Sequence, residues 1–435
     1  MTKAILLLVL CSAPACYAEA PTALAIRDAR VVTVSGPTLD KATVVVRDGL
    51  IEAVGENIPI PGDAWIIDGA GLTVYPGLID ALSTWGIPEP PPAAPPAAPG
   101  QAPLNGPPPA RGPEDRPSNT SWLRAADLVR PNNQRIADAR NAGFTTAVSF
   151  PARGIFAGQG AVVNLGGERA GEMVVASPAG LYLRMASSGF GGGFPASSMG
   201  VIAYVRQIYL DAEHYRSARD VYAKTPSGMQ RIHYDRALEG VLETPRVLLP
   251  VPRAIDIERM IRFSAELKTS TILYGGHEAY RSAGLLKDSA IPLLVSLKWP
   301  ERSRDADPEE PVSLQELELR EKAPSTPATL AKAGVPFAFY SDGIEKPRDV
   351  LKSVKRAIDA GLGAEAAVRA MTLAPAEFYG VADRLGSIGI GKIANLVVTR
   401  GNLFDDNTRV EYVFVDGVKF QPMAEAATAE EPASR

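Results

Sequence analysis

The sequence contains very little cysteine and histidine, and this limits the chemistry that is open to it. Its 435 residues include two cysteines and three histidines. Both cysteines, Cys11 and Cys16, lie in the first sixteen residues, within a segment that has the features of a removable leader. A disulfide framework and a cysteine-based zinc module are therefore excluded. Loss of the leader would leave a mature chain without a thiol, which excludes thiolate catalysis as well.

Long apolar runs and a strong excess of one charge are also missing. A membrane-spanning helix needs about 20 apolar residues, and no stretch of the sequence reaches that length. The 45 basic and 49 acidic residues give a net charge of −4, and no basic block stands out. We therefore expect no transmembrane segment and no nucleic-acid partner. A hydrophobic content of 46% with 22% charged residues is typical of a folded chain with a large core.

Residues 1–20 have the layout of a secretory signal peptide. Lys3 precedes an apolar run over 4–10, and small residues follow up to Ala18 and Ala20, after either of which cleavage fits. The sequence thus predicts an exported protein, periplasmic or extracellular. The alternative is a lipoprotein anchored at Cys16, which is disfavoured by Pro14 and by the lack of a large aliphatic residue at Ala13.

Short segments of strand-like alternation occur near both ends of the chain. Asp48-Gly49 and Asp416-Gly417 each separate two such segments, and Asp-Gly is typical of tight hairpin turns. Neither set can bury a sheet face alone, so residues 21–70 and 395–422 are predicted to form one small β-sandwich domain. The residues beyond, 423–435, have almost no apolar bulk and are predicted to be disordered. The expected strands cover residues 31–34, 43–46, 51–54, 396–398, 410–415 and 418–420.

Residues 71–394 alternate between apolar strand-like runs and helical periodicity, which predicts a (β/α)8 TIM-like barrel. Such a barrel takes about 250 residues, so the segment has room for insertions. The largest, residues 88–117, holds 13 prolines and is predicted to be an extended polyproline-like loop. We favour a passive excursion at the barrel mouth over a recognition motif. The expected strands include residues 145–150, 246–251, 271–274, 291–297 and 335–340, and the helices include 257–267 and 350–358.

Three stretches of the sequence resemble the amidohydrolase superfamily, specifically its imidazolonepropionase-like members. The first is Val-Tyr-Pro-Gly-Leu-Ile-Asp at 74–80, and the second is Ala-Gly-Phe-Thr-Thr at 142–146, with Gly-Gln-Gly at 158–160. The third is the longest and has four parts, at residues 334–336, 341–343, 370–375 and 385–392. The resemblance covers both ends of residues 24–420 closely and the middle loosely, and it implies the same barrel with a split β-domain.

The resemblance implies hydrolysis of a non-peptide carbon–nitrogen bond, as in a cyclic amide, by water on one or two divalent metals such as zinc. It places a His-X-His pair at positions 82 and 84, where this sequence has Leu82 and Thr84, and a further histidine near Pro250. Asp342 is the one position that matches a family ligand by type. Since a metal shell cannot be completed from these residues, no cofactor is predicted. Two functions stay open: a carbon–nitrogen hydrolase, and a metal-free pseudoenzyme that binds a ligand or a partner.

Asp342 is the candidate catalytic residue, because it follows a strand and barrel sites lie at the C-terminal ends of strands. His277, Lys298 and Thr84 are pocket candidates. His277 follows a predicted strand and has a functional and a structural role open to it. Lys298 ends another strand and has the alternative of a solvated side chain, while Asp342 has the alternative of starting a turn.

The remaining features of the sequence carry no chemistry. His214 and His233 are predicted to lie on solvated faces of helices, among charged neighbours. Residues 189–194 lack the spacing of a phosphate-binding loop and are predicted to form a loop over the barrel mouth. The sequence leaves the identity of a small-molecule substrate, and the oligomeric state, unspecified.

Overall fold

The computed structural model describes residues 23–88, 112–187, 194–302 and 311–422, together with residues 305, 307 and 309. The predicted signal peptide, with Cys11 and Cys16, lies outside the described residues. So do most of the proline-rich insertion, most of the 189–194 loop and the C-terminal tail. In the described ranges, no helix combines the length and the hydropathy that crossing a bilayer requires.

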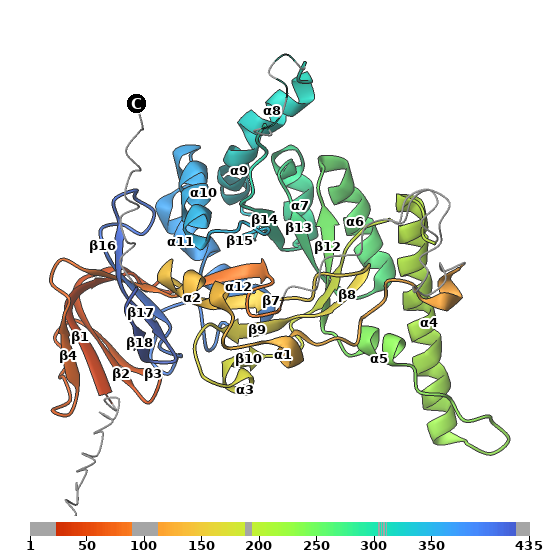
Figure 1. Cartoon of the computed structure of the whole chain (residues 1–435), viewed down its shortest axis with the longest axis horizontal. Coiled ribbons are helices and arrows are strands. Elements are labelled where there is room, and N and C mark those ends of the chain that lie inside the picture. The colour runs from red at the N-terminus through yellow and green to blue at the C-terminus, as the bar shows by residue number, and fades with distance from the viewer. Residues whose placement is uncertain are drawn as a thin grey trace, which may run out of the picture.

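The two ends of the chain share one eight-stranded sheet (Figure 1). Its strands are β1 (Ala23–Val31), β2 (Leu39–Arg47), β3 (Leu50–Gly55), β4 (Trp65–Asp68), β5 (Thr73–Pro76), β16 (Leu396–Arg400), β17 (Arg409–Val415) and β18 (Val418–Phe420). They run in the order β18–β17–β16–β5–β1–β2–β3, with β4 paired to β1. The ends therefore pair, but a two-layered β-sandwich is not confirmed. The strand predicted over 31–34 is also shifted, because β1 ends at Val31 and Val34 has a φ of 66° that breaks the extended chain.

Both predicted Asp-Gly hairpin turns are present, and they meet in space. Asp48 and Gly49 have φ values of 51° and 80°, and Asp416 and Gly417 have 52° and 75°. A Cβ on Gly417 would lie 2.8 Å from the Cα of Gly49, and a Cβ on Gly49 would lie 2.9 Å from the carbonyl oxygen of Asp416. Glycine is needed at both positions for its positive φ and for this close approach.

Seven strands of the central segment run parallel to a neighbour: β6 (Leu78–Ser83), β7 (Phe144–Ser149), β11 (Leu181–Leu183), β12 (Arg246–Val251), β13 (Ser270–Gly275), β14 (Leu293–Ser296) and β15 (Phe337–Tyr340). They belong to two sheets, β10–β9–β7–β6 and β15–β14–β13–β12–β11–β8. The strands β8 (Phe156–Gln159), β9 (Ala161–Asn164) and β10 (Val174–Ala176) pair antiparallel.

The mixed α/β class is confirmed, but the closed (β/α)8 barrel is not. Between β7 and β11 the chain forms the short antiparallel strands β8, β9 and β10, so the hydrogen-bonded ladder is interrupted there. At the other junction the ladder is also open, but β6 and β15 approach each other. The backbone N–H of Ser341, just after β15, donates to Oδ1 of Asp80 in β6 over 3.0 Å.

The described helices are α1 (Ala125–Leu128), α2 (Gln134–Asn141), α3 (Ala170–Met173), α4 (Ser198–Lys224), α5 (Arg236–Leu242), α6 (Ala254–Leu267), α7 (Ala283–Ser289), α8 (Leu314–Lys322), α9 (Thr326–Ala333), α10 (Pro347–Asp359), α11 (Ala364–Ala370) and α12 (Leu373–Tyr379). Helices α6, α7, α9 and α10 lie on the outer side of the parallel strands (Figure 1). Helix α12 instead packs against the inward-facing side chains of the strands, through Ala374, Ala376 and Tyr379. The helices predicted over 257–267 and 350–358 are confirmed within α6 and α10.

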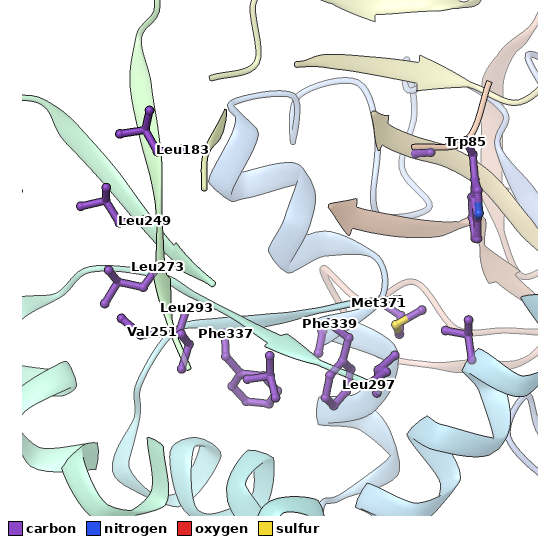
Figure 2. Close-up of a cluster of buried hydrophobic side chains, with 14 of the residues drawn as sticks. Trp85, Leu183, Leu249, Val251, Leu273, Leu293, Leu297, Phe337, Phe339 and Met371 are labelled. Atoms are coloured by element: carbon purple, nitrogen blue, oxygen red, sulfur yellow. The ribbon is translucent and has the colours of Figure 1, made fainter. Parts of the chain in front are cut away.

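Alternation along the parallel strands divides the core of the central segment into two clusters. Leu249, Leu273, Leu293 and Phe337 come from four successive strands and pack on the helical side (Figure 2). Their neighbours in the chain point to the opposite face and pack against each other; they include Leu248, Ile272, Leu294 and Ala338. The strands of the two central sheets, β6 to β15, surround these side chains and are together called the strand ring, although their hydrogen-bonded ladder is not closed. Burial on both faces explains the continuous apolar runs in these strands.

The structure contradicts the helical location predicted for one histidine. His214 lies in α4 with an exposed side chain, as predicted, whereas His233 lies in the loop between α4 and α5, also exposed. The helical prediction for His233 was wrong, because Pro226 and Gly228 follow the end of α4 and disfavour its continuation. A new helix starts only after Asp235, whose side chain accepts hydrogen bonds from the first turn of α5.

Candidate functional site

The candidate site lies where β13, β14 and β15 end, and Ser296 is the residue that links its members. Ser296 Oγ donates to Asp342 Oδ2 over 2.8 Å. The Nε2 of His277 donates to the backbone carbonyl of Ser296 over 3.2 Å. Asp342 is exposed and has a φ of 50°, so it stands at a turn rather than in the strand. The structure therefore brings Asp342 and His277 to the same residue.

His277 is held in place on its other sides as well. Its backbone carbonyl accepts a hydrogen bond of 2.8 Å from the hydroxyl of Thr326, and its ring lies 5.7 Å from the ring of Trp299. Burial lowers the pKa of His277, although the hydrogen bond to Ser296 and the charge of Asp342 oppose that shift. A neutral ring that donates to a carbonyl supports the structural role for His277 more than a role as a charged partner.

Lys298 and Thr84 do not join this group. The side chain of Lys298 is exposed, and its backbone N–H donates to Ser296 Oγ over 3.1 Å. The hydroxyl of Thr84 accepts a hydrogen bond of 2.9 Å from the guanidinium of Arg135 in α2. Lys298 is therefore linked to Asp342 only through its backbone N–H and Ser296 Oγ. The hydroxyl of Thr84 is hydrogen-bonded to α2 instead.

The positions at which the resemblance places metal ligands are filled by packed side chains. Leu82 is 6% exposed and belongs to the inner hydrophobic cluster. Pro250 pairs in register with Tyr274, so Tyr274, and not His277, occupies the end of β13 beside it. The hydroxyl of Tyr274 donates to the carbonyl of Leu183 over 2.8 Å, which fixes the ring.

Tyr274 is the centre of a tyrosine cluster inside the strand ring. Its ring centroid lies 5.3 Å from that of Tyr182 and 6.3 Å from that of Tyr340. Burial raises the pKa of all three phenols, so they stay neutral at ordinary pH. Neutral phenols are poor ligands for a divalent cation. Within the described ranges, no three histidine, cysteine, aspartate or glutamate side chains are grouped to hold a metal ion, so the residues present do not fit the family's metal centre.

Asp80 is a buried carboxyl group at the end of the 74–80 stretch, and the sequence alone predicts no role for it. It is 1% exposed, and its Oδ1 accepts from the N–H groups of Ser341 (3.0 Å) and Leu82 (3.5 Å). Its Oδ2 has no hydrogen-bond partner among the described residues. Burial raises the pKa of Asp80 to about 7, and the charge of Asp342 adds to that rise. An aspartate between the apolar residues of a buried strand is the sequence signal that could have singled it out.

Comparison with known proteins places this geometry in a family. The model of the amidohydrolase family matches residues 278–419, which include Asp342. A crystal structure of an amidohydrolase from Thermotoga maritima MSB8 superposes with a TM-score of 0.74 at 26% identity, over 92% of this chain and 100% of that one. The chain belongs to the amidohydrolase superfamily.

Two further proteins are similar to this amidohydrolase-superfamily chain, one in a short stretch of sequence and one in fold. An enamidase from Eubacterium barkeri is 53% identical over 49 residues, and the match spans 11% of this chain and 13% of the enamidase. A Xaa-Pro dipeptidase crystallised with methionine in its active site superposes with a TM-score of 0.53 at 17% identity, over 92% of this chain and 100% of that one. The second comparison shows the shared fold alone.

Proposed function

We propose that this protein is a metal-free member of the amidohydrolase superfamily, in its imidazolonepropionase-like branch, that binds a small-molecule ligand or a partner. The observation that carries the proposal is the content of the ligand positions. Leu82 is packed in the core, and Tyr274 is hydrogen-bonded to Leu183 beside Pro250. Restoring a metal site would require new side chains at several positions, not a change of rotamer, because leucine and proline have no donor atom.

A second candidate function is hydrolysis of a non-peptide carbon–nitrogen bond, such as that of a cyclic amide. Superfamily membership and the exposed carboxylate of Asp342 favour it. Asp342 stands at the C-terminal end of β15, which is where barrel enzymes place catalytic groups, and Ser296 Oγ orients it over 2.8 Å. In such a reaction Asp342 would act as a general base toward water, with no charged partner from His277, whose lowered pKa keeps it neutral.

The two functions differ in their response to chelators and to Asp342→Asn. We expect no chelator-sensitive turnover of cyclic amides, N-acyl amino acids or dipeptides, because the donor set of a metal site is missing. Any turnover that is found should survive EDTA and fall at least 100-fold in Asp342→Asn, since a general base contributes roughly 10²–10⁴-fold. Turnover that EDTA abolishes and zinc restores would refute the metal-free proposal. Unchanged turnover in Asp342→Asn would show that Asp342 has only a structural role.

We also propose that the protein is exported through the signal peptide at residues 1–20, with a lipoprotein anchored at Cys16 as the alternative. The layout of the first twenty residues supports this. The partner is proposed to be a small molecule and not nucleic acid, because the net charge is −4. A mature N-terminus other than residue 19 or 21, determined on protein from the periplasm, would contradict the proposed cleavage.

A further inference from the structure

A cavity with a volume of about 720 Å³ lies beside the C-terminal half of α4, and none of its lining residues belongs to the site at the ends of β13, β14 and β15. Its walls come from α4, from the loop between α4 and α5, and from α5 itself. Figure 1 shows α4 extending past the parallel strands, and its contacts there are with α5. Sites for small molecules have volumes of about 300–1,000 Å³, so this cavity has the size of such a site.

The loop that forms one wall is held against the helices on both sides of it. Ile232, near its C-terminal end, is half-buried and packs against the main hydrophobic cluster. The backbone N–H of Asp235 donates to the Tyr215 hydroxyl of α4 over 3.4 Å, and the carboxylate of Asp235 forms an ion pair with Arg116. The wall therefore has a defined position beside α4.

Three tyrosine rings line the cavity from its floor to its rim. Tyr215 is 8% exposed and forms the floor, Tyr222 is half-buried, and Tyr234 is 76% exposed. The Tyr215 hydroxyl donates to Glu239 over 2.8 Å. The hydroxyls of Tyr222 and Tyr234 have no hydrogen-bond partner in the part of the chain that the structure describes. Aromatic rings pack well against other flat rings, so the cavity suits a ligand with an aromatic group.

The charged side chains of the cavity leave one positive charge without a partner. Glu239 forms an ion pair with Arg219, and Glu243 forms one of 2.8 Å with Arg124. The guanidinium of Arg231 also lines the cavity, is exposed, and has no hydrogen-bond or ion-pair partner among the described residues. Both carboxylates are thus offset by guanidinium groups, and Arg231 gives the wall a net positive charge.

A cation is the alternative ligand for a cavity with three tyrosines, because the faces of aromatic rings attract cations. The two glutamates of the wall are already paired with Arg219 and Arg124. A cation on the rings would therefore lie near Arg231 with no free carboxylate to offset the repulsion. The charges of the wall favour an anion instead, and arginine binds a carboxylate through two parallel N–H donors.

We propose that this cavity is a second binding site, for a small aromatic carboxylate. The aromatic ring of the ligand packs on Tyr222 and Tyr234, and its carboxylate pairs with the guanidinium of Arg231. The proposal does not depend on the function proposed for the strand ends, because the two sites share no residue.

Calorimetric titration of the full-length protein with 2-naphthoate tests the proposal. We expect one molecule to bind per chain. The amine 2-naphthylmethylamine has the same ring and the opposite charge, and it should bind at least tenfold more weakly. Arg231→Gln should weaken the binding of 2-naphthoate at least tenfold and remove its advantage over the amine, because the charged hydrogen bonds to the carboxylate are lost. Tyr222→Ala should weaken the binding of 2-naphthoate at least fivefold.

Two control variants locate the bound probe. Arg27→Gln removes an exposed arginine of the terminal sheet and should leave the affinity for 2-naphthoate unchanged. Asp342→Asn alters the strand ends and should also leave it unchanged. The thermal midpoint of each variant is measured, so that loss of binding is not confused with unfolding.

Four results would overturn the proposal. They are no binding of 2-naphthoate, equal or tighter binding of the amine, an affinity that neither Arg231→Gln nor Tyr222→Ala changes, and loss of binding in Asp342→Asn. The second would assign the cavity to a cation, and the last would place the probe at the strand ends.

Discussion

The protein should lose stability as the pH rises from 4 to 7, and Asp80→Asn should not show this loss. Asp80 is 1% exposed, and burial raises its pKa from 3.8 to about 7. A carboxyl group whose pKa is raised on folding binds its proton more tightly in the folded state. Its contribution to stability is therefore complete below about pH 4 and is lost as the pH rises through about 7. At 1.36 kcal/mol per unit of pKa, the loss is on the order of 4 kcal/mol.

The measurement is the free energy of unfolding in urea at pH 4, 6 and 8, for the unaltered protein and for Asp80→Asn. The slopes with pH are compared, not the absolute values, because asparagine places a new donor where Oδ2 of Asp80 has no partner. Asp40→Asn removes a carboxylate that is 94% exposed and serves as the matched control. Identical slopes in the unaltered protein and Asp80→Asn would show that Asp80 does not titrate in this range.

Replacing Asn164 with leucine should destabilise the protein by about 3–5 kcal/mol. Asn164, at the end of β9, joins the strand ring to the terminal sheet. Its Nδ2 donates to Asp416 Oδ1 over 2.7 Å, and its Oδ1 accepts from Thr146 (3.0 Å) and Asn395 (2.8 Å). Leucine would remove all three hydrogen bonds, although Asn395 Nδ2 would keep its bond to Thr146 Oγ1. The Asp416 carboxyl group, the Thr146 hydroxyl proton and one N–H of Asn395 would lose their partner, and each such group costs about 1–3 kcal/mol, more when it is charged.

Chemical denaturation measures the effect of Asn164→Leu. Asn132→Leu, at an exposed position, is the matched control and should change stability by less than about 0.5 kcal/mol. A destabilisation of Asn164→Leu within that range would mean that Asn164 does not hold the terminal sheet to the strand ring.

Local sequence patterns predicted a large part of the fold. The Asp-Gly turns at 48–49 and 416–417 specify hairpins through their own backbone preferences, and the apolar runs of β12 to β15 reflect burial on both faces. The antiparallel strands β8 to β10 could not be predicted in the same way. An apolar run has the same period in a parallel and an antiparallel strand, so its direction depends on long-range pairing.

The contacts within the candidate site also depend on long-range packing, so the sequence predicted them only in part. The sequence indicated that His277 follows the end of β13, but Gly275 and Gly276 both have positive φ and turn the chain there. This turn directs His277 to the carbonyl of Ser296 and leaves Tyr274 in the interior. Ser296 carries no signal of its own in the sequence, because its role comes from contacts with residues 19 and 46 positions away.

The metal content of the purified protein tests the central claim most directly. Protein purified without a metal-affinity resin is dialysed against zinc, then against metal-free buffer, and analysed for zinc, manganese and iron by mass spectrometry of the elements. Leu82, Pro250 and Tyr274 provide no ligand set, so we predict far less than one equivalent of metal per chain. One equivalent of a metal that chelators remove and zinc replaces would contradict the metal-free account.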